Sequence, residues 1–85
     1  MNLKCVPRLA KAVRIRKESF GYLVFDPSTM NVYELNEYGK QVLDVCDGKS
    51  ALEDIAARLG CSSDDIVDLD VFLQDLLQRQ IIEVT

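Results

Sequence analysis

The chain has 85 residues, with 14 acidic and ten basic side chains, a net charge of −4, three cysteines and no histidine. A chain of this size buries roughly 60 to 70% of its unfolded surface, so it fits one domain with one small core and leaves little room for a deep active site. It has no apolar run of about 18 residues and no apolar stretch near its start, so we expect no membrane span, no secretory signal and a cytoplasmic location.

The three cysteines, Cys5, Cys46 and Cys61, are too far apart for a paired zinc spacing, and no histidine completes a site. We therefore expect free thiols, no metal and no cofactor, with Cys46 as a small core residue on an apolar helix face. We also expect no enzymatic activity, because the sequence has neither a nucleophile beside a plausible base nor a phosphate-binding loop.

Positive charge is concentrated at the start of the chain. Residues 1–17 hold six bases and no acid, whereas residues 18–85 carry a net charge of −10. Residues 1–11 contain Pro7 and little periodicity, which predicts a flexible or extended basic arm ahead of a domain at 12–85. The bases either keep the chain soluble or form a surface that selects charged partners.

Three short strands are predicted next, at residues 12–17, 20–25 and 31–35. The second is apolar at both parities, which is typical of a central strand covered on both faces, and Gly21 within it indicates a bulge or a close backbone approach. Asp26-Pro27-Ser28-Thr29 predicts a turn, after which the third strand has only one neighbour. Its outer N–H and C=O groups are therefore open to water, to a peptide or to a second copy of the chain, which would give a homodimer.

Three helices are predicted after the strands. Asn36 is expected to cap the first helix. Ser50 and Glu53 have the spacing of a capping box for the second helix. Ser62 or Ser63 is expected to cap the third helix.

The third helix, 64–79, is apolar over more than half of its circumference, whereas a helix that touches one core needs a stripe of about 100°. One interpretation is that the whole stripe packs against the sheet and a last strand, expected at 81–84. The other is a second contact outside the core, formed by Val67, Val71 and part of Phe72.

The order of elements predicts an α+β fold of the winged helix-turn-helix-like kind, with a three-stranded antiparallel sheet, three helices and a short C-terminal strand. A winged-helix DNA-binding transcription regulator is the competing interpretation. It is disfavoured because the third helix carries five aspartates and one base, Arg79, whereas a recognition helix presents basic and amide side chains to DNA. We expect no nucleic-acid partner.

Several segments resemble the pyrroloquinoline-quinone biosynthesis D protein family, a stand-alone group of precursor-peptide recognition elements. They are GYLVFDPSTMNVYELN, the helix start LNEYG, DGKS leading into LEDIAARLG, and the final QIIEV. RKESFGYLVF is also similar to the recognition protein of mycofactocin-type systems. The resemblance covers about residues 12–84, and its motifs are patterns of apolar residues and turns.

This resemblance implies a protein that binds the leader segment of a ribosomally made precursor peptide and presents it to a modifying enzyme, often a radical S-adenosylmethionine enzyme. In the family the leader adds an antiparallel strand between the third strand and the third helix, which correspond to 31–35 and 64–77 here. The candidate peptide-binding residues are Asn31, Val32, Tyr33, Glu34, Leu35, Val67, Asp68, Val71, Phe72 and Asp75.

The charged candidates have two interpretations. Asp68, Asp75 and Glu34 either select a basic leader residue or form a solvated face. Arg14 and Arg16, on the outward side of the first strand, are predicted to dock the modifying enzyme.

Overall fold

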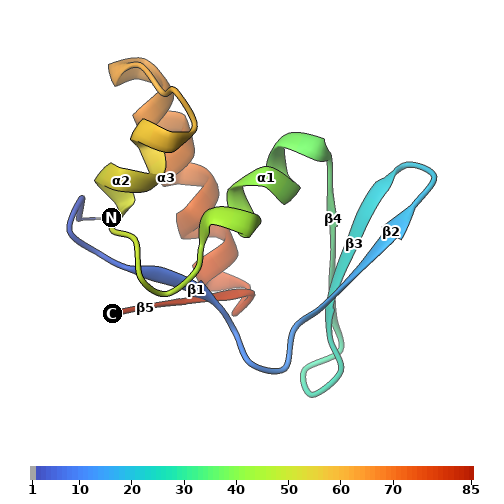
Figure 1. The fold of residues 1–85 in the computed structure, drawn as a ribbon. Coiled ribbons are helices and arrows are strands. Elements are labelled where there is room, and N and C mark those ends of the chain that lie inside the picture. The colour runs from blue at the N-terminus through green and yellow to red at the C-terminus, as the bar shows by residue number, and fades with distance from the viewer. Residues whose placement is uncertain (1) are drawn as a thin grey trace.

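The computed structural model describes residues 2–85 (Figure 1). The strands are β1 Pro7–Leu9, β2 Arg14–Glu18, β3 Gly21–Asp26, β4 Asn31–Leu35 and β5 Ile82–Val84, and the helices are α1 Glu37–Val45, α2 Leu52–Arg58 and α3 Ser63–Gln78. The predicted α+β class is confirmed, whereas the likeness to a winged helix-turn-helix stays a prediction. No helix within the described range is long and apolar enough to cross a membrane.

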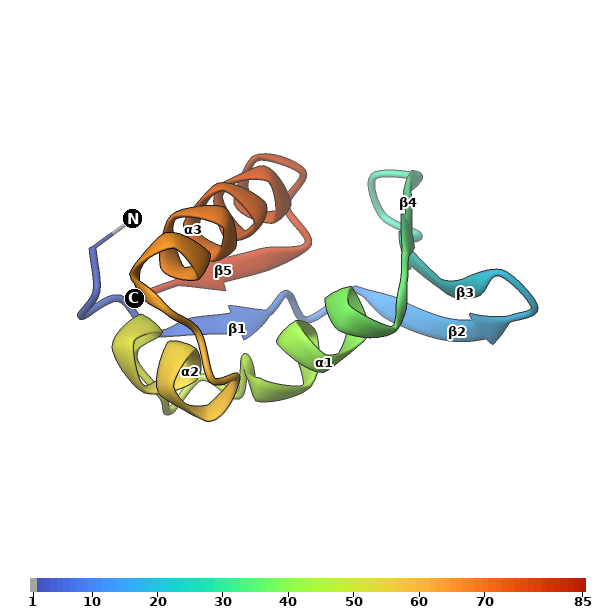
Figure 2. The same cartoon turned by 90° about the horizontal axis from the view of Figure 1, so that it is seen from above.

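Strands β2, β3 and β4 form an antiparallel meander with β3 in the centre, as predicted. Side chains alternate between the two faces of this sheet. On the inner face, Ile15, Tyr22, Val24, Tyr33 and Leu35 belong to the hydrophobic core or pack against it. The tip of the β2–β3 hairpin projects away from the helices in both views (Figure 2).

The opposite, outer face of the sheet carries two cross-strand rows, which are Arg14–Phe25–Val32 and Arg16–Leu23–Glu34. None of these side chains belongs to the core, and Val32 is 60% exposed. The prediction that the central strand is covered on both faces is therefore wrong. The three helices pack on one side of the sheet only, so Leu23 and Phe25 remain half-buried on the other side.

A second sheet has two strands and joins the start of the chain to its end. β1 pairs antiparallel with β5, with Pro7 opposite Val84 and Leu9 opposite Ile82. Residues 7–9 of the segment expected to be an arm are thus part of the fold, and the C-terminal strand pairs with them. Pairing between residues this distant in sequence leaves no local pattern that would predict it.

Two of the predicted helix starts are confirmed. The Asn36 side chain accepts a hydrogen bond from the Gly39 amide at 2.8 Å at the start of α1. Ser62 caps α3 in a reciprocal capping box with Asp65, and this amide-bonded carboxylate has a pKa below its usual value. Because these caps depend on neighbours three residues away, the local sequence is enough to predict them.

The capping box predicted at Ser50 is wrong. α2 begins at Leu52, and the N–H groups of its first two residues donate to the carbonyls of Cys5 and Leu3, at 2.9 and 3.1 Å. The Ser50 hydroxyl instead donates to Asp47 at 3.4 Å. The backbone carbonyls ahead of β1 therefore cap α2, in place of the Ser50 side chain that was predicted to do so.

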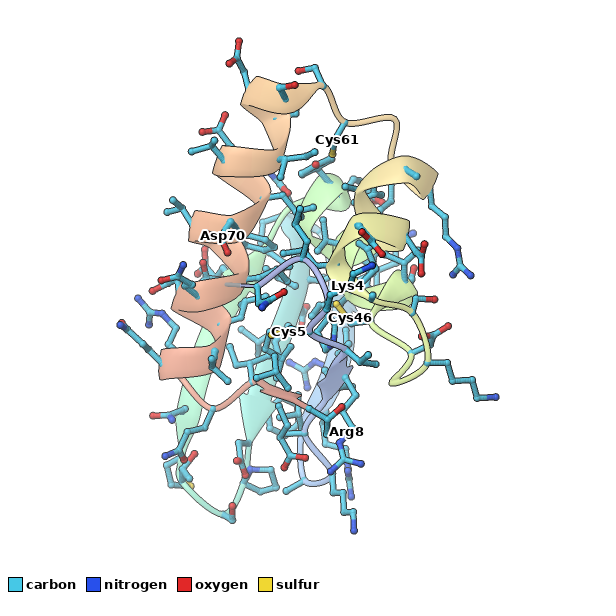
Figure 3. All side chains as sticks on the ribbon, turned by 90° about the vertical axis from the view of Figure 1, so that its left-hand side faces the viewer. Lys4, Cys5, Arg8, Cys46, Cys61 and Asp70 are labelled. Atoms are coloured by element: carbon cyan, nitrogen blue, oxygen red, sulfur yellow. The ribbon has the colours of Figure 1, made fainter. Side chains whose placement is uncertain are left out.

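The core lies between the inner face of the three-stranded sheet and the helices, and it includes Cys46, which is 5% exposed. Burial raises the pKa of this thiol to about 12. Cys5 and Cys61 are partly exposed, and Cys61 lies in the turn between α2 and α3 (Figure 3). The expectation that Cys46 is a core residue is confirmed.

Iodoacetamide at pH 8 should alkylate Cys46 at least about 100-fold more slowly than Cys5 and Cys61, because the thiolate is the reactive form and this thiol is both buried and protonated. Peptide mass spectrometry over time measures the three rates. Urea should bring the rates together. Equal labelling of all three thiols in the folded chain would contradict the burial of Cys46.

Candidate functional site

β4 is an edge strand, since within residues 2–85 β3 is the only strand that pairs with it. The two-residue hairpin between β2 and β3 is closed by the Glu18–Gly21 pair, which directs the backbone groups of Gly21 and of every second residue after it to β2. By the register with β4, the N–H and C=O groups of Val32 and Glu34 then point to the open edge. The position of the Leu35 carbonyl is consistent with this register, because the carbonyl faces β3. A Cβ added to Gly21 would lie 2.4 Å from its oxygen.

The helix α3 has an apolar surface outside the core. Leu69, Leu73 and Leu76 are buried, at 2% exposure or less. Val67 and Val71 lie one turn apart on another side of the helix and are 62% and 63% exposed. The interpretation that the whole apolar stripe packs inside the domain is therefore wrong, and the second apolar face is present.

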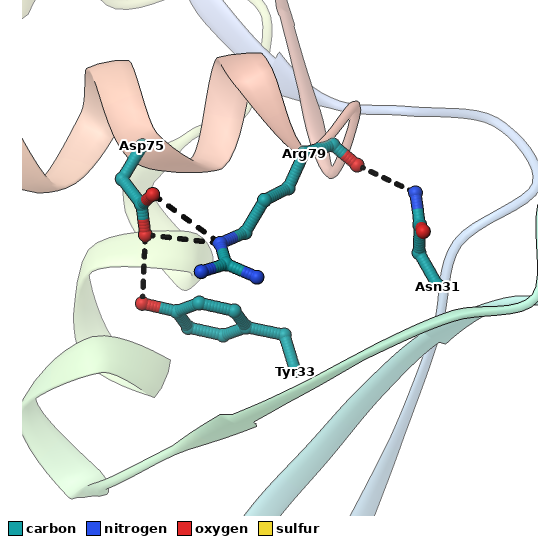
Figure 4. Close-up of polar contacts among 4 residues, drawn as sticks. All are labelled: Asn31, Tyr33, Asp75 and Arg79. Carbon is teal, nitrogen blue, oxygen red and sulfur yellow. Dashed lines mark hydrogen bonds and ion pairs between the residues drawn. The ribbon is translucent and has the colours of Figure 1, made fainter.

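A polar network joins β4 to the C-terminal end of α3 (Figure 4). The Tyr33 hydroxyl donates to Asp75 Oδ2 at 3.2 Å, and Arg79 Nε donates to both oxygens of the same carboxylate at 3.2 Å. The Arg79 guanidinium lies over the Tyr33 ring, 4.7 Å from its centre, and the Arg79 carbonyl accepts from Asn31 Nδ2 at 3.2 Å. Burial, and then the hydrogen bond to Asp75, raise the pKa of the Tyr33 hydroxyl.

Two hollows lie along α3, one near each end of the helix. A hollow of about 250 Å³ is lined by β4 and the end of α3, with Asn31, Tyr33, Gln78 and Arg79 among its residues. A hollow of about 300 Å³ lies near the start of α3 and is lined by Tyr38, Leu59, Asp65, Asp68, Leu69 and Phe72. We call the surface that runs from one hollow to the other, between β4 and α3, the groove.

The second hollow combines an apolar floor with a polar rim. Leu69 and Phe72 contribute apolar surface, and the carboxylates of Asp65 and Asp68 lie on the same side. The pKa of the Tyr38 hydroxyl is raised, first by burial, then by the neighbouring Cys61 thiol and these two carboxylates. Such a site matches a side chain with an apolar stem and a basic end.

Four predicted site residues lie apart from the groove, whereas Val32 borders its hollow near the end of α3. Leu35 is 4% exposed, so its side chain lies in the core, and its backbone pairs with β3. The side chains of Val32 and Glu34 point to the outer face of the sheet, opposite to Tyr33. Arg14 and Arg16 share that outer face.

Several residues that line the groove were not predicted as site residues, among them Tyr38 and Arg79. Tyr38 is 48% exposed in the first turn of α1, and an aromatic residue at such a position is usually read as core. Arg79 was identified only as the single base on α3. Its contact with Tyr33 joins residues more than 40 positions apart, so no local spacing could have revealed it.

These features define a small α+β module with an unpaired strand edge beside a helix that has an exposed apolar face, an arrangement suited to strand addition by a peptide. The chain belongs to the PqqD family, because the family model described as coenzyme PQQ synthesis protein D matches residues 21–82. Membership confirms the resemblance noted in the sequence and suggests an accessory, peptide-binding role associated with PQQ synthesis. No curated protein and no solved structure matches the chain significantly.

Proposed function

We propose that this chain binds the leader segment of a ribosomally made precursor peptide as an added strand on β4, and presents it to a modifying enzyme of the radical S-adenosylmethionine type. The observation that carries the proposal is the open edge of β4 beside an apolar face of α3 that the domain itself does not cover. Family membership supports the same role. The role is non-catalytic.

Strand addition alone gives too little affinity. Four backbone hydrogen bonds at a net ~0.5–1.5 kcal/mol each contribute about 2–6 kcal/mol. A micromolar complex needs about 8 kcal/mol. Burying one leader Leu, Ile or Phe against α3 adds roughly 1.5–3 kcal/mol, so one or two such anchors bring the complex to this range. Val67, Val71 and Phe72 are the residues proposed to receive them.

The acidic residues of the groove divide into two groups. Asp75 already accepts hydrogen bonds from Tyr33 and Arg79, so its charge is largely satisfied within the chain. Asp68 lines the hollow near Tyr38, and its carboxylate makes no hydrogen bond or ion pair with other described residues. We therefore assign the selection of a basic leader residue to Asp68 rather than to Asp75.

The proposal is tested by two substitutions at one position of the open edge. Glu34→Pro removes the outward N–H of β4 and places a ring at the edge, so the affinity for leader peptide should fall about tenfold or more. Glu34→Ala keeps the N–H and should leave the affinity within about twofold. The measurement is calorimetric titration with a synthetic leader of the precursor encoded beside this chain, with circular dichroism as the check on folding.

Two outcomes would contradict the proposal. One is equal leader affinity for the Glu34→Pro and Glu34→Ala variants. The other is a titration followed by amide NMR in which residues 31–35 and α3 do not shift. A leader that instead competes with dimer formation through the same edge still identifies β4 as the binding strand, because both partners would use the same backbone groups.

A further inference from the structure

The outer face of the three-stranded sheet combines uncovered apolar side chains with an unpaired positive charge. We propose that this face docks a partner protein surface that carries apolar side chains beside a carboxylate, and that the partner is the enzyme that modifies the bound peptide. This inference rests on the proposed function, and it places the enzyme on the side of the sheet opposite to the core.

The apolar part of this face is contiguous. Phe25 lies directly opposite Val32 across the β3–β4 pair, and Leu23 is two residues along the same strand. Met30, in the turn before β4, is 81% exposed. These four side chains line a hollow of about 320 Å³. Apolar surface gathered in this way marks an interaction site, and a flexible methionine at its border suits an adaptable contact.

The two arginines of the face differ in their partners. Arg16 forms an ion pair with Glu18 at 2.5 Å. Arg14 lies opposite Phe25, and its guanidinium makes no hydrogen bond or ion pair with any residue in the described part of the chain. A carboxylate from outside is therefore the group that complements this corner of the apolar surface.

A second copy of the chain fits this face poorly. Two such faces can stack with two-fold symmetry about an axis along the strands or across them. An axis along the strands places β2 over β4 of the other copy, so that Arg14 lies over the apolar Val32. The only acid of the two rows, Glu34, then lies over Arg16, which already pairs with Glu18. An axis across the strands places β2 over β2 and brings arginines together. A different protein with an acidic residue at this point avoids both costs.

The test compares two charge reversals on exposed positions. Arg14→Glu should weaken binding of the leader-loaded domain to the purified modifying enzyme at least about tenfold, whereas Lys49→Glu, on the loop between α1 and α2, should change it less than about twofold. Met30→Ser should also weaken enzyme binding, because it removes apolar surface at an 81% exposed position without risk to the core. Leader affinity, measured in the same buffer, should be unchanged in all three variants.

Each result has one meaning. If the leader binds normally and the Arg14→Glu and Met30→Ser variants bind the enzyme as the unmodified chain does, the docking face is wrong and the proposed function stands. If the leader does not bind the unmodified chain, the proposed function itself fails. Sedimentation of the chain alone as a dimer that Arg14→Glu dissociates would overturn the choice of an enzyme over a second copy.

Discussion

Replacing Gly21 with alanine should lower the melting temperature of the domain by about 15–25 °C. Gly21 has φ of +139°, a conformation that is nearly closed to residues with a side chain, and the added Cβ would lie 2.4 Å from the Leu35 carbonyl oxygen. Strain and steric overlap together cost about 3 kcal/mol or more. An 85-residue domain has only about 4–13 kcal/mol of stability, and each kcal/mol shifts its melting temperature by about 4–8 °C.

Gly60→Ala is the matched control for this prediction. Gly60 also has a positive φ, of +70°, but a Cβ there would meet nothing within 4 Å. Its replacement should cost only about 1 kcal/mol, or about 4–8 °C. Thermal unfolding followed by circular dichroism compares the two variants. If both variants lower the melting temperature by the same amount, the close contact between Gly21 and the Leu35 carbonyl is not the reason that position 21 requires glycine.

The close approach at Gly21 also shows which parts of this fold were predictable. A glycine inside an apolar strand indicated a bulge or a tight contact, and the structure places it against the Leu35 backbone. The Asn36 and Ser62 caps were equally predictable, because each depends on a donor three residues away. The bounds of β4 followed from a turn at one end and a helix cap at the other.

The parts that sequence reasoning missed are contacts between distant segments. β1 is too short to show a pattern and pairs with β5 at the other end of the chain. The cap of α2 comes from the carbonyls of Leu3 and Cys5 instead of Ser50. The outer face of β3 was misread because apolar residues at both parities are typical of a buried strand, and an apolar face kept for a partner has the same composition.

In the candidate site, too, the local elements were predictable and the contacts between distant residues were not. Its two walls, β4 and α3, were predicted as elements, and the exposed Val67 and Val71 confirm that α3 has a second apolar face. The network of Tyr33, Asp75 and Arg79 was not predicted, although it changes the chemistry of the groove. The network links β4 to α3, and it engages Asp75, one of the acids predicted to select a basic leader residue.

Val71→Asp should weaken leader binding by about 10- to 100-fold while leaving the domain folded. Val71 lies one helical turn before Asp75, which contacts Tyr33 of β4, so its exposed side chain borders the groove. The substitution removes an apolar contact worth about 1.5 kcal/mol and buries a carboxylate against the leader's apolar anchor. Because the position is 63% exposed in the free chain, the free energy of unfolding should change by less than about 0.5 kcal/mol.

Gln41→Asp adds the same charge at an exposed position of α1 and serves as the control. Calorimetric titration with the synthetic leader should give Gln41→Asp an affinity within about twofold of the unmodified chain. Equal losses in both variants would mean that the leader responds to overall charge and not to α3. An unchanged affinity for Val71→Asp would remove α3 as the second wall of the groove, since an anchor that packs beside this residue cannot tolerate a desolvated carboxylate.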